Sequence, residues 1–397
     1  MRYDAIIIGA GPAGGTAALM LARAGWSVAV IEKSSFPRRK VCGEFISATS
    51  MPLLQELGLL DDFLKRAGPE VRRVGLFAKD VVLAAPMPQP SNRSGQWGRA
   101  LGREHLDLLV LDAARHAGAA VWQPWKANEL RRSDIGYQCT IANGEASREL
   151  TAPIVIAAHG SWENGNLPTQ ASAPHLPSDL LAFKARFTNS NLSPDLMPLL
   201  AFPGGYGGMV HTDSRRVTLS CCVRRDQLRE CRQMSDEPHA ANAVLHHIKN
   251  SCAGVRDALK DATVQHAWLS AGPIRPGLRR RRIGGIFLVG NCAGEAHPIV
   301  AEGISMAMQS AALLCRRLIA RRHDALTGPG IAAIGRDYAR EWKKAFAPRI
   351  YAASLFSRLA MSPAAARLLL PLLNHAPRIL TVGAHLSGKA NQVIAEV

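Results

Sequence analysis

The chain has 397 residues, of which 47% are hydrophobic and 20% are charged. This length and composition allow at least one large core and leave room for two lobes, so they exclude a disordered chain or a small disulfide-stapled fold. Forty-eight Lys and Arg against 31 Asp and Glu give a formal net charge of +17. Such a field attracts phosphates, anionic lipid or acidic substrates without selecting among them.

The cysteines and the N-terminus indicate where the protein is expected to work. The eight cysteines include no C-x-x-C pair, so no metal site is expected and reduced thiols are the simpler interpretation. Met1 to Asp4 place an acid where a signal peptide needs its apolar core, and no apolar run is long enough to span a bilayer. These features predict a cytoplasmic protein.

The first forty residues predict strand, glycine turn, helix, strand and acid in that order. Ala5–Ile8 is a short apolar, β-branched run that stops at Gly9. The sequence from Pro12 to Ala24 has helical spacing, and Ser27 to Ile31 is typical of a second buried strand. This order is that of a Rossmann-like unit, which implies an α/β fold with a parallel sheet.

The turn itself reads Gly9-Ala10-Gly11-Pro12-Ala13-Gly14. Gly9 allows the tight turn, Gly11 lets the backbone approach a pyrophosphate, and Gly14 lets the helix pack on the strand. The phosphate would lie at the N-terminus of the helix, on its unpaired N–H groups. Glu32, eighteen positions after Gly14, is placed to accept hydrogen bonds from the ribose hydroxyls. The predicted contacts of this half are Gly9, Gly11, Pro12, Ala13, Gly14, Glu32 and Lys33.

Another buried strand is predicted near the other end of the chain, over Ile283–Val289, and it runs into the glycine-rich segment Gly290–Met308. Together with the N-terminal turn, this segment resembles the two fingerprints of the large FAD-dependent family that includes aromatic-ring hydroxylases, flavin-dependent halogenases and geranylgeranyl reductases. The resemblance covers most of the first 325 residues and implies a glutathione-reductase-type fold with FAD as cofactor. Where the family has an acid for the ribityl chain, this chain has Asn291, whose amide can still donate and accept hydrogen bonds.

The rest of this segment is expected to lie against the flavin ring. Gly303 lets the backbone approach a flat ring, and a helix over Ile304–Leu318 would direct its N-terminus at the pyrimidine edge. A helix N-terminus stabilises an anion there by about 0.3 to 2 kcal/mol. The resemblance implies that Pro298 lies against the ring face. His297 is either an acid or base beside the flavin or a loop histidine, and both interpretations stay open.

Two more segments resemble family elements. Gly102–Leu109 is similar to the R-x-x-L-D-x-x-L helix, which implies that Arg103 reaches the adenosine-side phosphates of FAD. Phe36–Glu44 resembles the strap that crosses the flavin in halogenases and geranylgeranyl reductases, in which Cys42 and Gly43 would supply backbone contacts. The Cys42 thiol is interpreted as a packing group, since no base is apparent beside it.

The remainder divides into a substrate domain and a tail. Strand-like runs with turns occupy Leu167 to Trp268, and the resemblance implies an antiparallel sheet there that covers the ring side of FAD, with Val74 to Trp97 added to it. The predicted organisation is a discontinuous FAD-binding domain over residues 1–73, 98–166 and 269–325, a substrate-binding domain over 74–97 and 167–268, and a C-terminal helical region over 326–397. The strand-like runs within the substrate domain include Leu180–Phe187, Tyr206–Val210 and Val217–Val223.

The electron donor is left open. The strand Ile154–Ala157 is followed by His159, where the hydroxylases have an acid linked to NADPH binding, so hydroxylase-style handling of NADPH is in doubt. No other strand–glycine–helix unit occurs, which argues against a separate nicotinamide domain. Electrons would come from transiently bound NAD(P)H or from a partner flavin reductase.

The tail from Tyr338 to Val397 is rich in Ala and Leu and is basic. One interpretation is a helical pair packed on the flavin domain with its basic residues on a solvated face. The other is peripheral contact with anionic lipid at the inner face of the membrane. The run Arg279–Arg282 is also expected to be solvated. The basic residues are dispersed without interleaved aromatics or a recognition helix, so no nucleic-acid partner is expected.

Three flavin reactions fit this pattern. The first expectation is a monooxygenase of secondary metabolism that uses dioxygen to hydroxylate a small apolar aromatic or polyketide-like substrate through a flavin hydroperoxide. The alternative is a saturase of the geranylgeranyl-reductase type. Phe202–His211 partly resembles the Y-x-W-x-F-P element of those reductases: Tyr206 matches, but Gly208, Val210 and His211 replace the remaining positions. Tyr206 either hydrogen-bonds the substrate or is a core tyrosine. Halogenation comes third, because the W-x-W-x-I-P pattern is absent.

Overall fold

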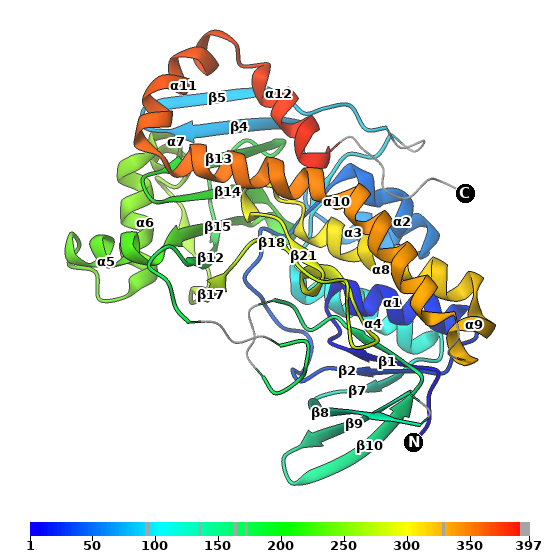
Figure 1. The fold of residues 1–397 in the computed structure, drawn as a ribbon. Coiled ribbons are helices and arrows are strands. Elements are labelled where there is room, and N and C mark those ends of the chain that lie inside the picture. Colours follow the sequence, from blue (N-terminus) through cyan, green and yellow to red (C-terminus); the bar gives the residue numbers. More distant parts are fainter. Residues whose placement is uncertain (92–94, 135, 162–164, 171–173, 328–329, 390–397) are drawn as a thin grey trace.

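The computed structural model describes residues 1–91, 95–134, 136–161, 165–170, 174–327 and 330–389 (Figure 1). Parts of the predicted domains, including the last eight residues of the tail, lie outside these residues. The fold has a parallel sheet at one end, a larger mostly antiparallel sheet at the other, and helices that the C-terminal part of the chain adds across both. The predicted fold class is therefore confirmed.

The six-stranded sheet carries the predicted glycine turns. Its strand order is β19-β20-β11-β1-β2-β7, and every neighbouring pair except β19–β20 is parallel. The residues of the central strands are fully buried and apolar, as expected for a parallel sheet covered on both faces. The strands are β1 Ala5–Ile8, β2 Val28–Ile31, β7 Ala120–Trp122, β11 Ile154–Ala157, β19 Arg282–Ile283 and β20 Ile286–Leu288.

Three helices bring the cofactor motifs to this sheet. Helix α1 (Pro12–Arg23) packs between α4 (Arg103–His116) and α8 (Gly303–Ala320). The predicted helices that begin near Pro12 and Ile304 are thus confirmed, and α8 begins one residue earlier than expected. Shorter elements beside them are β3 Phe45–Ile46, α2 Met51–Glu56, α3 Leu60–Arg66, β6 Arg99–Ala100, β18 Gly277–Leu278 and β21 Gly294–Glu295.

The single strand predicted over Ile283–Val289 is wrong. The chain turns back at Gly284 and Gly285, which both have positive φ angles of 62° and 126°, and Ile283 pairs with Ile286 across an antiparallel hairpin. Two adjacent glycines are a strong signal for this tight turn, because both central positions need φ angles that other residues avoid. Only β20 continues the parallel sheet toward the second glycine segment.

A three-stranded meander beyond β7 was not predicted. Its strands are β8 Lys126–Ser133, β9 Gly136–Asn143 and β10 Ala146–Ala152. Figure 1 shows the meander at the end of the molecule farthest from the large sheet. In β9, buried residues such as Cys139 and Ile141 alternate with partly buried ones, which matches a sheet with one face on the core and one toward solvent.

The large sheet has the order β16-β12-β15-β14-β13-β4-β5, with β17 also paired to β12. The three strands predicted within Leu180–Val223 are present, and the segment after Val74 contributes two more, as expected. The pair β13–β4 is parallel and the other pairs are antiparallel. The strands are β4 Arg73–Ala78, β5 Val81–Pro86, β12 Leu180–Thr188, β13 Leu196–Phe202, β14 Gly205–His211, β15 Val217–Arg224, β16 Thr263–Val264 and β17 Leu269–Ile274.

The sequence suggested strands with turns over the whole of Leu167–Trp268, but part of this segment is helical. Between β15 and β16 it forms α5 (Arg225–Gln233), α6 (Ala240–Ser251) and α7 (Ala253–Ala258). Apolar residues of α6 and α7, such as Val244 and Val255, join a core with Phe183 and Leu219 of the sheet. Packing on the sheet thus stabilises helices whose own sequence signal is weak.

The tail is helical, as predicted, but its basic residues are not all solvated. It contains α9 (Arg322–Thr327), α10 (Ile331–Met361), α11 (Pro363–His375) and α12 (Ile379–Ala384), followed by a turn of π-helix to Lys389. Arg349 and Lys389 are buried beside the Glu302 carboxylate. A buried carboxylate needs cationic or hydrogen-bonding partners, which explains why these two cations are buried and not solvated.

The run Arg279–Arg282 also differs from its prediction, because only Arg280 is exposed. Arg279 donates to the backbone oxygens of Asn291 and Arg275, and the Arg281 guanidinium lies over the Trp342 ring at 5.0 Å. The run therefore joins the second glycine segment to α10.

Candidate functional site

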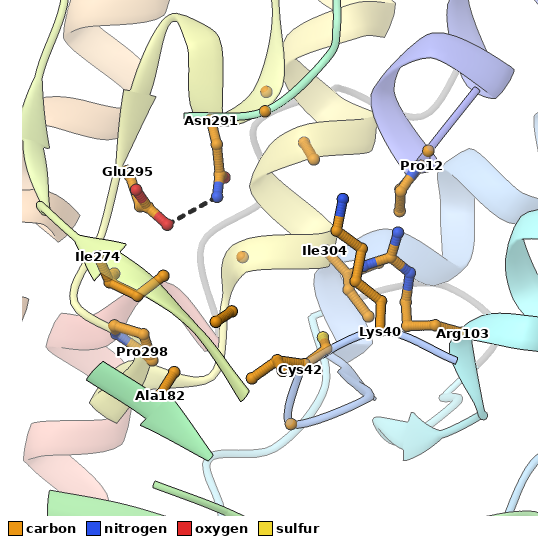
Figure 2. Close-up of a pocket in the computed structure, with 18 of the residues that line it drawn as sticks. Pro12, Lys40, Cys42, Arg103, Ala182, Ile274, Asn291, Glu295, Pro298 and Ile304 are labelled. Atoms are coloured by element: carbon orange, nitrogen blue, oxygen red, sulfur yellow. Dashed lines mark hydrogen bonds between the residues drawn. The ribbon is translucent and has the colours of Figure 1, made fainter. Parts of the chain in front are cut away.

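One cavity of about 360 Å³ extends between the parallel sheet and the large sheet. Both predicted glycine turns, the strap and five strands of the large sheet line it. Figure 2 shows Pro12, Lys40 and Arg103 on one side, and Ile274, Glu295 and Pro298 on the other. Of the predicted site residues, those that line the cavity are Gly9, Gly11, Pro12, Ala13, Glu32, Lys33, Cys42, Gly43, Arg103, Tyr206, Asn291, Pro298, Gly303 and Ile304.

The two predicted residues outside that lining are Gly14 and His297. A Cβ at Gly14 would lie 1.8 Å from the Gly9 backbone oxygen, so this glycine serves the packing of helix on strand. Gly9 has a φ of 101°, and a Cβ there would lie 2.6 Å from the Ala158 backbone oxygen. A Cβ at Gly11, by contrast, would meet only an Arg103 nitrogen, at 3.5 Å. Gly11 is thus where the backbone faces the cavity.

Glu32 closes the second strand as a buried carboxylate at the edge of the cavity. Its Oε2 accepts the Ala10 backbone N–H at 3.0 Å, and its Oε1 accepts that of Ser34 at 2.9 Å. Arg38 of the strap donates to it at 3.3 Å. These bonds fix the carboxylate in the place where an adenine ribose would need acceptors.

Arg103 stands at the start of α4 and reaches toward the first glycine turn. Its Nε and Nη2 donate to the two oxygens of Asp107, each at 2.7 Å, which fixes the plane of the guanidinium. One edge of the guanidinium therefore faces Gly11. Lys40 points into the same side of the cavity (Figure 2). Two cations beside the N-terminus of α1 make this side suited to phosphates.

The strap is held on the large sheet by a buried ion cluster that the sequence did not predict. The Glu44 carboxylate accepts hydrogen bonds from Lys184 and Arg186 of β12, and from the Thr218 hydroxyl at 2.6 Å. Burial raises the pKa of Glu44, but the two cations outweigh it and hold the pKa below its ordinary value. The sequence carried one signal for this cluster: Lys184 and Arg186 lie two positions apart on a largely apolar strand. Buried cations of this kind need a carboxylate partner.

The second glycine segment meets the first one directly. A Cβ at Gly290 would lie 3.0 Å from the Ala13 Cβ and 3.4 Å from that of Ala307 on α8. At Gly303 a Cβ would meet no atom within 4 Å, so the start of α8 opens toward the cavity. The N-termini of α1 and α8 therefore both face this cavity, which suits a ligand with phosphates at one place and an electron-rich ring at another.

Asn291 does not stand alone in place of the family's acid. Its amide nitrogen donates to Oε1 of Glu295 at 2.8 Å (Figure 2), and Ser161 donates to Oε2 at 2.6 Å. Glu295 is buried, lines the cavity, and has Arg279 at 3.5 Å. Burial raises the pKa of Glu295. Sequence reasoning missed this carboxylate, although it lies within the same glycine-rich segment.

The far side of the cavity is mostly apolar and belongs to the large sheet. Met197 and Leu199 line it, and Gly208, which pairs with Leu199, leaves the wall without a side chain there. Gly207 and Met209 face the other side of the sheet, where Met209 joins the core with Leu219. The result is an apolar recess beside the place where a flavin ring would lie.

Tyr206 is the polar group of this recess that sequence reasoning singled out. It is buried, and its hydroxyl lies 3.1 Å from His297 Nδ1. Burial, with the charge of Arg358, lowers the pKa of His297 to about 4, so the imidazole is neutral at pH 7. His297 contacts Tyr206 and is not among the residues that line the cavity.

The cavity fits FAD by three observations on these residues. The cavity extends past both glycine turns. The positions where the protein backbone must come close to the cofactor carry no side chains. The buried Glu32 and Arg103 lie where a ribose and phosphates would need them. Gly11, Pro12, Ala13, Glu32 and Arg103 would hold the adenosine half. The strap and the residues from Asn291 to Ile304 would hold the flavin half.

Comparison with known proteins places the chain. Residues 2–341 match the FAD binding domain family. Menaquinone reductase of Mycolicibacterium smegmatis is 29% identical over 157 residues, 39% of this chain and 37% of the reductase. Digeranylgeranylglycerophospholipid reductase 2 of Methanopyrus kandleri is 24% identical over 380 residues, 91% of this chain and 88% of the reductase. In three of the comparisons with curated relatives, the matched part covers 37%, 63% and 28% of the relative's length, which is less than two thirds in each.

Solved structures share the fold. The myxobacterial chondrochloren halogenase superposes with a TM-score of 0.78 at 18% identity and covers 98% of this chain and 91% of its own. A protein of Pseudomonas aeruginosa described as a probable FAD-dependent monooxygenase has a TM-score of 0.70 at 17% identity, and the match covers 92% of this chain and 98% of that protein. The chain belongs to the FAD binding domain family.

Proposed function

We propose that the protein is a monooxygenase that hydroxylates an apolar, ring-containing substrate. The observation that carries the proposal is the recess of the large sheet, where Tyr206, hydrogen-bonded to the neutral His297, lies beside a wall of Met, Leu and Gly. A pocket of this kind selects an apolar body with one polar group, because buried polar groups need a partner.

Gly208 favours a flat substrate. It lies on the same face of β14 as Tyr206, at the position where the related reductase element has an aromatic residue. The absence of a side chain there leaves a slot in the wall of the cavity. A planar ring fits such a slot better than a flexible chain, since the ring gains its contacts with less loss of conformational freedom.

Tyr206 and His297 would handle the proton of a substrate hydroxyl. The Tyr206 hydroxyl can accept a hydrogen bond from the substrate while it donates its own proton to His297 Nδ1. The neutral imidazole accepts this hydrogen bond, and because burial raises the pKa of Tyr206 and lowers that of His297, the proton stays on the phenol. A hydrogen bond donated by the substrate hydroxyl to Tyr206 makes an aromatic ring more electron-rich at the carbon to be oxygenated.

FAD, when bound, supplies the electrons and the activation of dioxygen. The chain's own contribution is to exclude water and to orient the substrate. The apolar wall removes water from the reacting face, and the N-terminus of α8 stabilises negative charge at the ring. The electron donor is proposed to be NAD(P)H bound transiently, or a partner flavin reductase.

A second candidate is a reductase of isoprenoid double bonds. The strap with Cys42 and Gly43, and the relatives that reduce menaquinone or geranylgeranyl lipids, favour it. Halogenation is less well supported, because the lysines lining the described cavity are Lys33, Lys40 and Lys126, none of which lies on the large sheet.

The test is a pair of reactions under labelled dioxygen. The holoenzyme, reduced with NADPH and a flavin reductase, is given an alkyl-substituted phenol in one vessel and a polyprenyl lipid in the other, and products are weighed by mass spectrometry. The proposal predicts one labelled oxygen atom in the phenol. A product that has gained two hydrogens from the lipid, with no oxygen in the phenol, would establish the reductase instead.

The matched variants are Tyr206→Phe and Tyr137→Phe. Loss of the Tyr206 hydroxyl should lower turnover about tenfold to a hundredfold or more, while the amount of FAD bound per chain stays the same. Tyr137 donates to the Gly284 backbone oxygen, outside the lining of the cavity, and its loss should leave turnover unchanged.

A further inference from the structure

The end of the chain leaves an unusual amount of apolar surface uncovered. Among the described residues, seven of the twelve large hydrophobic side chains that are exposed lie between Tyr351 and Leu386. Helix α11 is almost entirely apolar, yet of its thirteen residues only Leu370 is buried. The seven side chains, called here the C-terminal apolar surface, are Tyr351, Leu355, Leu368, Leu372, Ile379, Val382 and Leu386.

The spacing of these residues is helical within each element. Tyr351 and Leu355 are four positions apart on α10, as Leu368 and Leu372 are on α11. Ile379, Val382 and Leu386 are separated by three and four positions along α12 and the turn after it. Residues at such spacing share one face, so each helix presents an apolar stripe to solvent.

The charge of this region has one sign. Between Trp342 and Lys389 the sequence holds seven Lys or Arg and no Asp or Glu. Arg349 and Lys389 are buried at Glu302, but Arg358, Arg367 and Arg378 are exposed and lie within three positions of Leu355, Leu368 and Ile379. An apolar surface bordered by cations complements an anionic lipid surface, where apolar side chains enter the acyl boundary and the cations stay at the headgroups.

The position of the surface relates it to the cavity. Helix α10 packs against β13, β14 and the turn Pro298–Val300, which form the substrate side. Figure 1 shows α11 and α12, in orange and red, together beyond β4 and β5 at the end of the molecule opposite the meander. None of the helices in the described residues has the length and apolarity to cross a bilayer, so the contact would be with one leaflet.

We propose that the C-terminal apolar surface, with Arg358, Arg367 and Arg378, docks the protein on an anionic lipid bilayer, from which the apolar substrate enters the cavity. The docking does not depend on which flavin reaction follows. A hydroxylase and a reductase would both gain from it, since an apolar substrate is concentrated in the membrane.

Vesicle flotation of the holoenzyme tests the docking. Vesicles of phosphatidylcholine with phosphatidylglycerol should carry the protein, vesicles of phosphatidylcholine alone should carry much less, and added salt should release it. The double variant Leu368→Ser with Leu372→Ser should bind at least about tenfold more weakly. Arg367→Gln with Arg378→Gln should bind about 25-fold more weakly to the anionic vesicles, at about a factor of five for each charge.

Controls and contrary outcomes are matched to these variants. Met234→Ser and Arg232→Gln change exposed residues of the same kinds near the end of α5 and should bind like the unchanged protein. Hydrogen exchange of the unchanged protein should slow over residues 363–386 when anionic vesicles are added. Equal binding by the leucine variant, no vesicle binding at all, or a dimer in light scattering that the leucine variant dissociates would each overturn the proposal; the last would assign the surface to a second copy.

Discussion

The two ends of the cavity are built by different means. At the adenosine end the backbone does most of the work: Gly9, Gly11 and Gly14 shape a turn in which added side chains would collide with main chain or fill the site. At the substrate end, side chains of the large sheet, such as Tyr206 and Leu199, form the wall. A backbone site tolerates few residue types, whereas a side-chain site can change its lining and keep its fold. The first end therefore defines the family and the second defines the reaction.

The largest effect is expected at Gly14. A Cβ placed 1.8 Å from the Gly9 oxygen forces the turn apart, so Gly14→Ala should lower the free energy of unfolding by about 3 to 5 kcal/mol, in the upper range for single substitutions. Gly11→Ala has room for its methyl group and should keep the stability of the FAD-free protein while it weakens FAD binding. Urea unfolding and flavin content measure both, and equal loss of stability in the two variants would contradict this division.

The join between the two ends is the Glu44 cluster, and breaking it should be nearly as costly. Glu44→Gln leaves Lys184 and Arg186 buried without their carboxylate and should cost about 3 to 5 kcal/mol at pH 7. Because the folded-state pKa of Glu44 is lowered, its contribution is present above its ordinary pKa and is lost as the pH falls through the folded-state value. The difference between variant and parent should therefore shrink in acid.

The matched control is Glu70→Gln, which removes a partly exposed carboxylate paired with Arg72 and Arg99. Such a pair is worth about 0 to 1 kcal/mol. Chemical unfolding at several pH values compares the two. A Glu44 variant no less stable than the Glu70 variant would show that the strap needs no such anchor.

A smaller and more local effect is expected at Arg103. If its guanidinium contacts the phosphates, Arg103→Ala should weaken FAD binding about tenfold to a hundredfold, the range for a charge-assisted hydrogen bond. Flavin fluorescence titration measures this, with Arg115→Ala on the exposed end of α4 as the control. Unchanged affinity would leave Arg103 as a partner of Asp107 alone.

The smallest effect concerns the substrate end and its pH dependence. His297 is neutral when folded, with a pKa of about 4 against 6.5 ordinarily. A lowered pKa means that stability is present above pH 6.5 and falls as the pH drops toward 4. His297→Asn should flatten this part of the profile of melting temperature against pH, and the exposed His323→Asn should not. A profile that does not change in His297→Asn would show that the imidazole is not held neutral.

The sequence was informative where steric rules left little choice. The strand–turn–helix unit at Ala5–Arg23 and the start of α8 were predictable, because glycine spacing and apolar periodicity report directly on backbone geometry. The helices α5 to α7 and the hairpin at Gly284 were not predicted, since packing on the large sheet and a local turn overrode the apparent pattern.

For the site, the sequence predicted individual residues but not the contacts between them. Tyr206 and His297 lie 91 positions apart and were named separately, but only the fold brings them to 3.1 Å. Glu295 and Glu44 were missed as functional or anchoring groups because a carboxylate's role depends on its partners, here Asn291 and Ser161 for one and Lys184 and Arg186 for the other. Long-range ion pairs leave no local spacing in the sequence.

FAD titration tests most directly whether both glycine turns hold one cofactor. The FAD-free protein and its variants Gly11→Val and Gly303→Val are titrated with FAD and followed by flavin fluorescence. The account predicts one FAD per chain for the parent protein and weak binding in both variants, because each valine would fill space at a different end of the same cavity. A parent that stays colourless with added FAD, or a variant of either turn that binds FAD as the parent does, would contradict it.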